Sequence, residues 1–257
     1  MGGAIGIELA SLGVNLNFAP VLDIESNPDN PVIAARSFGN TPEAVTEKAL
    51  SFLAQMEANG VRGCGKHFPG HGDTKVDSHY ELPIIDAPLD VLRHRELKPF
   101  AAAIKNGIGM IMTSHILFRA LDEAFPATLS RRIAHDLLRR EMGFEGVIVS
   151  DDIGMHAVNA LFDSPDAAVQ FMAAGNDMLM ICAHWTDTER VRALARALLD
   201  GRRGGAIENS TLDRARERID VMLAATAHNE VHALPDDVFR RHALPGTVFS
   251  DDTVEVV

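Results

Sequence analysis

Five short apolar runs alternate along the chain with stretches of helical periodicity. The runs begin at Asn15 (NLNFAPVLDI), Val61 (VRGCGKHF), Ile108 (IGMIMTSH), Gly146 (GVIVSDD) and Asn176 (NDMLMIC). Each run is nearly continuous and has a polar cluster at its C-terminal end. This pattern is typical of a parallel β-strand that is buried on both faces. We therefore predict a strand in each run.

The stretches between the runs carry helix start and stop signals. Thr41 precedes PEAVTEKALSFLAQME, and Ser130 precedes RRIAHDLLRREM. Both are residue types favoured at helix N-caps, and Gly60 and Gly143 follow the last turns. Alternating strands and helices predict a parallel α/β fold. Because polar residues gather where the strands end (PVLD, KHFPGHG, TSH, SDD), we expect a TIM-type (β/α) barrel, whose active sites lie at that face.

The length of the chain does not suffice for a full barrel of such units. The runs start about 40 residues apart, so eight units need roughly 320 residues, whereas the chain has 257 and opens directly on a predicted helix. We expect a barrel that lacks its N-terminal strand or strands and therefore has open edges. A truncated chain, an unusual start site and closure by another protomer through these edges are the alternatives. Residues 1–227 form the predicted barrel domain, and the polar residues 228–257 form a tail or linker remnant.

The composition is that of an acidic globular protein. The net charge is −12 and the pI is near 5.3, which argues against nucleic acid and anionic membrane surfaces as partners. Neither a membrane-spanning run nor a signal-peptide pattern is present in the sequence, so we expect a cytoplasmic protein. Cys64 and Cys182 lie in apolar runs and are expected to be buried free thiols.

The densest polar cluster, KHFPGHGDTKVDSH, follows the second run. In one interpretation His67, His71, His79 and Asp77 bind a metal such as zinc. In the other, Lys66 and His67 donate hydrogen bonds to a polar ligand while Asp77 orients His79 as a general acid/base. The spacing matches no compact metal-ligand pattern, and Lys66 places a cation beside any metal. We therefore favour the second interpretation.

Two further groups follow other runs. Ser150, Asp151 and Asp152 end the fourth run, and because side chains alternate along a strand, one acid is expected to point into the barrel mouth. A carboxylate there can serve as nucleophile, base or metal ligand. Arg36, in AARSFGN, can clamp an anionic or hydroxyl-rich substrate. His115 is expected to lie behind the pocket wall.

These motifs carry a resemblance to a known family. KHFPGHGDTKVDSH, with RSFGN upstream and GVIVSDDIGM downstream, resembles glycoside hydrolase family 3, most closely its bacterial single-domain β-N-acetylglucosaminidase branch, over roughly residues 1 to 226. The resemblance implies a retaining mechanism with Asp151 as nucleophile and His79, paired with Asp77, as general acid/base. A segment of the type D-x-E-G-G, which family members carry upstream, has no counterpart in this chain.

The resemblance also implies a substrate and its binding residues. The implied substrate is a terminal β-linked N-acetylglucosamine of a muropeptide or chitooligosaccharide, as in peptidoglycan recycling, and no metal or organic cofactor is implied. The implied substrate-binding residues are Arg36, Lys66 and His67, with Asp23 nearby. Met155, which follows the fourth run, is a further candidate from its position. A family 3 enzyme with another β-glycoside or with phosphate as acceptor, a non-catalytic sugar-binding remnant and a metal-dependent hydrolase remain alternatives.

Overall fold

The computed structural model describes residues 1–75, 82–182, 188–226, 228–234, 247–249 and 254–256. Its strands are β1 (Leu16–Asn17), β2 (Arg62–Phe68), β3 (Ile84–Ile85), β4 (Met110–Thr113), β5 (Leu117–Phe118), β6 (Val147–Asp152), β7 (Met178–Met180), β8 (Thr247–Phe249) and β9 (Val254–Val256). Its α-helices are α1 (Gly2–Ser11), α2 (Pro42–Glu57), α3 (Leu89–His94), α4 (Leu97–Lys105), α5 (His156–Asn159), α6 (Asp166–Ala173), α7 (Thr188–Arg203) and α8 (Asn209–Ala224). The 3₁₀ turns η1 (Ala34–Arg36), η2 (Ala127–Leu129) and η4 (Leu161–Asp163) and the π-helix η3 (Arg132–Glu141) complete the described elements.

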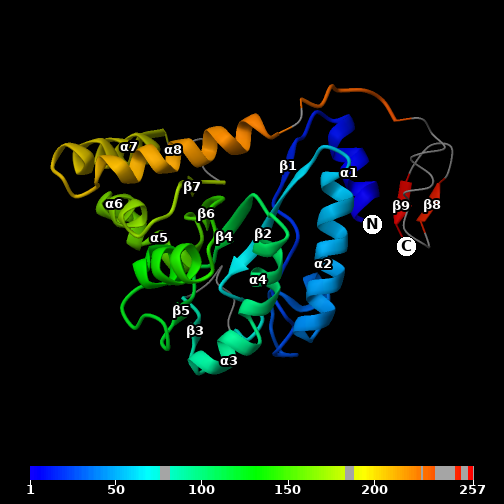
Figure 1. The fold of residues 1–257 in the computed structure, drawn as a ribbon, viewed down its shortest axis with the longest axis horizontal. Coiled ribbons are helices and arrows are strands. Elements are labelled where there is room, and N and C mark those ends of the chain that lie inside the picture. Colours follow the sequence, from blue (N-terminus) through cyan, green and yellow to red (C-terminus); the bar gives the residue numbers. More distant parts are fainter. Residues whose placement is uncertain (76–81, 183–187, 227, 235–246, 250–253, 257) are drawn as a thin grey trace.

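The central sheet has the strand order β1-β2-β4-β6-β7, and every neighbouring pair is parallel. Each of the five apolar runs contributes one of these strands, which confirms the predicted parallel α/β class. Within the described residues β1 and β7 are the edge strands, so the sheet is an open part of a barrel rather than a closed one. Figure 1 shows α1, α2 and α4 beside β1 and β2, and α5 and α6 beside β6 and β7.

The first strand is shorter than its apolar run. Hydrogen bonds from the backbone N–H groups of Cys64 and Lys66 reach the carbonyls of Ala19 and Pro20, but regular pairing covers only Leu16–Asn17. Pro20 has no N–H to donate to a ladder, which interrupts the strand. The run therefore continues as irregular chain and carries Asp23 over the end of β2.

The helix boundaries follow the signals in the sequence. The Thr41 hydroxyl accepts a hydrogen bond from the N–H of Ala44 at the start of α2, and the Ser130 hydroxyl accepts one from the N–H of Ile133 at the start of η3. Gly60 and Gly143 follow the two helices with positive φ, a conformation that glycine adopts without steric strain.

The two faces of the sheet bury different apolar clusters. Ile111 and Ile148 point toward the helices that cover the outer face, whereas Met110, Met112 and Val149 point toward the inner face. The inner cluster is partly covered by Ile219 and Met222 of α8, which runs across the sheet near β7 (Figure 1). Alternation along each strand thus leaves the inner face to side chains that line the barrel interior.

The chain has two cysteines, Cys64 and Cys182. Both cysteines are free thiols; Cys64 is buried, but Cys182 is exposed, so its predicted burial is wrong. The reason is that Cys182 lies just beyond the end of the edge strand β7.

The start of the predicted tail contacts the barrel, because the Asn229 amide donates to the carbonyls of Val14 and Gly60.

None of the helices in the described parts of the chain is long and apolar enough to span a membrane.

Candidate active site

A cavity of about 140 Å³ opens at the carboxyl ends of the sheet strands. Five of the predicted site residues line it together: Arg36, Lys66, His67, Asp151 and Met155. The remaining wall is formed by Phe18, Val32, His71, Met112 and Met180. A larger cavity, of about 670 Å³, lies at the opposite ends of the strands and includes Gly109, Gly146 and residues of α8. The chemistry predicted from the sequence gathers in the smaller cavity.

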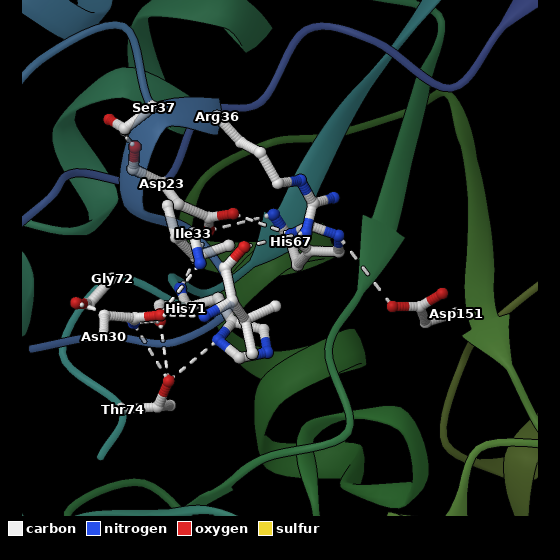
Figure 2. A network of polar contacts seen from close by, with 11 residues as sticks. Asp23, Asn30, Ile33, Arg36, Ser37, His67, His71, Gly72, Thr74 and Asp151 are labelled. Carbon is white, nitrogen blue, oxygen red and sulfur yellow. Dashed lines mark hydrogen bonds and ion pairs between the residues drawn. The ribbon is translucent and has the colours of Figure 1, made fainter. Parts of the chain in front are cut away.

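Asp23 and His67 form the closest polar pair of the site. The imidazole Nδ1 of His67 lies 2.7 Å from Oδ2 of Asp23, and Oδ1 of Asp23 accepts the backbone N–H groups of His67 and His71 at 3.0 and 2.8 Å. Figure 2 shows these contacts converging on the Asp23 carboxylate. Burial opposes ionisation of Asp23, but the charge and hydrogen bonds of His67 and the charge of His71 outweigh it, so its pKa is lowered.

The structure therefore places Asp23 behind His67 rather than on the cavity wall. Its side chain is fully buried, and its carboxylate oxygens are occupied by neighbouring donors. A direct contact between Asp23 and a ligand in the cavity is not part of this geometry.

Asp151 provides the carboxylate that faces the cavity. It lies on β6, its side chain is one-fifth exposed, and its Oδ2 is 3.9 Å from Nε2 of His67. Burial raises the pKa of Asp151, but the charges of His67 and His115, a backbone hydrogen bond from Asp152 and the charge of Lys66 outweigh this effect and lower it. Asp151 is thus an ionised, partly accessible carboxylate, as a nucleophile requires.

The side chains of Ser150 and Asp152, the neighbours of Asp151 on β6, accept hydrogen bonds from the protein backbone. The Asp152 carboxylate accepts the backbone N–H groups of Gly154 and Cys182, each at 3.0 Å, and the buried Ser150 hydroxyl accepts the N–H of Met180 at 2.8 Å. The alternation expected along the strand therefore directs Asp151 alone of the two adjacent acids into the cavity.

Two cations, Lys66 and Arg36, also line the cavity. Lys66 lies on β2, and its pKa is lowered by burial and by the nearby charge of Arg36, against the opposing charge of Asp151. Arg36 ends η1 and donates a hydrogen bond to the carbonyl of Val32 at 3.2 Å. Cationic N–H donors around a small cavity suit a ligand rich in hydroxyl or other acceptor oxygens.

Sequence reasoning missed Asn30, which organises the loop under the site. Its buried amide group donates to the carbonyls of His71 and Gly72 and to the Thr74 hydroxyl, and its carbonyl accepts the N–H groups of Val32 and Ile33 (Figure 2). The signal available in the sequence was the SNPDNP stretch, because asparagine before proline favours turns stabilised by the side chain.

Two buried histidines, His71 and His115, lie beside the site, and polar neighbours contact their rings. His71 has a pKa lowered to about 4 by burial and by the charge of His67, and its Nδ1 lies 3.0 Å from the Thr74 hydroxyl. The two ring nitrogens of His115 lie near the Thr128 hydroxyl and the Asp152 carbonyl, and burial lowers its pKa. His115 thus lies behind the cavity, as predicted.

Asp77 and His79, the predicted acid/base pair, lie outside the described residues. These two residues also belong to the predicted metal-ligand set. Among the side chains that the structure describes, no group of three or more histidines, cysteines, aspartates or glutamates is arranged to hold a metal ion.

The fold and the site together define an open (β/α)-barrel domain with a polar cavity at the carboxyl ends of its strands. The chain belongs to glycosyl hydrolase family 3, because residues 1–222 match the model described as "Glycosyl hydrolase family 3 N terminal domain".

Individual relatives agree with this assignment. The chain is 45% identical over 193 residues to Beta-hexosaminidase A of Pseudoalteromonas piscicida, which covers 70% of this chain and 32% of the relative. It is 39% identical over 200 residues to a beta-hexosaminidase of Alkalilimnicola ehrlichii, which covers 78% and 56%. A glycoside hydrolase family 3 beta-N-acetylglucosaminidase from Paenibacillus sp. str. FPU-7 superposes with a TM-score of 0.85 at 39% identity, covering 91% of this chain and 44% of that one. The chain thus spans between a third and somewhat more than half of these relatives.

Proposed function

We propose that this chain carries the catalytic site of a retaining β-N-acetylhexosaminidase that hydrolyses terminal β-linked N-acetylglucosamine. The observation that carries the proposal is the Asp151 carboxylate, which is kept ionised on the wall of a cavity lined by Lys66, Arg36 and His67. The names of the relatives, which are beta-hexosaminidases, support the choice of sugar.

In the proposed reaction Asp151 attacks the anomeric carbon of the bound sugar. The bond between that carbon and the glycosidic oxygen breaks, and the leaving oxygen takes a proton from the general acid. Water then attacks the glycosyl ester of Asp151, giving its proton to the same group acting as base, and releases the sugar with its original anomeric configuration. We assign the acid/base role to His79 paired with Asp77 on the family resemblance.

The side chains of the cavity suit the sugar. Lys66 and Arg36 donate to hydroxyl oxygens, while Met155 and Phe18 provide apolar surface for the ring. Muropeptides or chitooligosaccharides as substrates, a role in peptidoglycan recycling and a cytoplasmic location belong to this proposal and rest on the resemblance.

The test is hydrolysis of an aryl β-N-acetylglucosaminide by the purified 257-residue chain, beside its Asp151→Asn and Asp151→Ala variants. We expect turnover by the wild type, loss of turnover in both variants and unchanged circular dichroism. A folded wild-type chain that binds the sugar without turnover contradicts the proposal and supports a sugar-binding role.

Three additional assays separate the alternatives. The aryl β-glucoside tests another specificity, added phosphate tests transfer to phosphate, and EDTA tests a metal-dependent reaction. We expect the N-acetyl sugar to be preferred, phosphate to leave the product unchanged and EDTA to leave the rate unchanged.

A further inference from the structure

His67 has a carboxylate near each of its two ring nitrogens. Nδ1 lies 2.7 Å from the buried Asp23, and Nε2 lies 3.9 Å from the cavity-facing Asp151. We propose that Asp23 is a positioning residue that fixes the proton of His67 on Nδ1. The neutral imidazole then presents an unprotonated Nε2 to the cavity. The consequence for sugar binding rests on the proposed function, whereas the proton position does not.

The argument begins with the carboxylate. An ionised aspartate is only an acceptor, so each group within hydrogen-bond distance of it has to bring a hydrogen. Oδ1 of Asp23 is occupied by the N–H groups of His67 and His71, and Oδ2 faces Nδ1 of His67. Since the Asp23 side chain is fully buried, no solvent donor substitutes for the imidazole. Nδ1 of His67 therefore carries the hydrogen.

The proton position decides what the cavity presents to a ligand. A neutral imidazole has one N–H donor and one acceptor nitrogen, so a hydrogen on Nδ1 leaves Nε2 as an acceptor. Nε2 then takes a hydrogen bond from a donor such as a sugar hydroxyl, beside the donors Lys66 and Arg36. The cavity thus combines acceptors and donors, which matches a hydroxyl group better than an anion.

The Asp23→Asn variant inverts this arrangement with almost no change in shape. The amide oxygen continues to accept the two backbone N–H groups, and the amide NH₂ replaces Oδ2 opposite Nδ1 of His67. Because two donors cannot face each other, the variant drives the His67 proton to Nε2. A carboxylate that only filled space or held the loop would not produce this change.

The proton position is measured by long-range ¹H–¹⁵N NMR of the histidine rings in the full chain at a pH where His67 is neutral. The spectrum of a His67→Gln variant identifies the signals of His67. We expect a protonated Nδ1 in the wild type and a protonated Nε2 in Asp23→Asn. The Ser37→Ala variant, which removes hydrogen bonds to the backbone of Asp23 and Gly39 but leaves the Asp23 carboxylate unchanged, is the matched control and should leave the proton on Nδ1.

The wild-type spectrum alone decides the proposal if Asp23→Asn does not fold. A wild-type His67 protonated on Nε2 overturns it, and so does a folded Asp23→Asn chain that keeps the proton on Nδ1.

Kinetics provide a second readout when the chain turns over the aryl glycoside. We expect Asp23→Asn to lower kcat/KM on the order of 10²-fold and to change the pH profile. Turnover like that of the wild type overturns the positioning role. If the folded wild type shows no turnover, the proposed function fails, and the NMR result still decides the position of the proton.

Discussion

His67 and Asp151 come from strands that are not neighbours, yet their side chains meet in the cavity. His67 lies on β2 and Asp151 on β6, with β4 between them in the sheet, and Nε2 and Oδ2 are 3.9 Å apart. Curvature of the sheet toward its inner face brings the two strand ends together. The two side chains therefore share one wall of the cavity.

If Asp151 is the nucleophile, a mechanism-based sugar should become covalently attached to it. A 5-fluoro glycosyl fluoride of N-acetylglucosamine reacts through its good leaving group and then hydrolyses slowly, so the glycosyl ester accumulates. We expect intact-protein mass spectrometry to show one added sugar and peptide mapping to place it on Asp151. The Asp151→Asn variant should show no adduct.

The neighbouring acid is the matched control for this labelling. Asp152→Asn keeps an oxygen for the N–H groups of Gly154 and Cys182 and should label like the wild type. Labelling of any residue other than Asp151 rules out the proposed nucleophile.

Gly72 is predicted to tolerate no side chain, because a Cβ there would overlap the backbone carbonyl of Ile24. A backbone atom cannot rotate away, so we expect Gly72→Ala to lower the free energy of unfolding by about 1–3 kcal/mol or more. Gly109→Ala, where nothing lies within 4 Å of the added Cβ, should change it little. Urea denaturation of both variants measures the difference, and equal stabilities would show that the loop does not pack against Ile24 in this way.

Asp177 is predicted to be required for stability rather than for chemistry. It is buried between Arg139 and Arg218 and accepts the backbone N–H of Ile148 at 2.8 Å. Asp177→Asn leaves the mostly buried Arg139 without its counter-charge, and we expect a loss of about 3–5 kcal/mol in the free energy of unfolding.

The control for this variant is an exposed ion pair. Glu141 and Arg93 lie 2.9 Å apart with side chains nearly half exposed, so Glu141→Gln should change the unfolding free energy by only about 0–1 kcal/mol. Similar losses for Asp177→Asn and Glu141→Gln would contradict the importance assigned to burial.

His71 should make stability depend on pH below neutrality. Its pKa is about 4 in the folded protein and 6.5 in an unfolded chain. Between these values the unfolded chain binds a proton that the folded protein does not, so the free energy of unfolding falls as the pH is lowered from 6.5 to about 4. The full effect is about 3 kcal/mol.

Urea denaturation across this pH range tests the prediction. His71→Asn should remove much of the dependence, whereas Thr74→Val, which keeps the imidazole, should retain it. A His71→Asn variant with the wild-type slope would show that other groups account for it.

The strands and the cavity were predictable because both depend on local sequence. Continuous apolar runs specify buried parallel strands, and the carboxyl ends of parallel strands meet at one edge, so Asp151, Lys66 and Arg36 could be expected to gather. The position of Asp23 behind His67 was not predictable, since these residues are 44 positions apart and their contact depends on how irregular chain crosses β2.

Other features depended equally on tertiary structure. The role of Asn30 follows from the path of two loops, and the exposure of Cys182 follows from the edge position of β7. The acid/base pair of Asp77 and His79 and the division of the chain at residue 227 stay predictions.

The order of the strands in the sheet follows their order in the chain, β1-β2-β4-β6-β7. During synthesis, each strand of this sheet after β1 therefore emerges when its preceding neighbour in the sheet has already left the ribosome. The Asp23–His67 pair is complete once β2 has emerged, and Asp151 joins it some 80 residues later. The contacts that hold His67 can therefore form before Asp151 is synthesised.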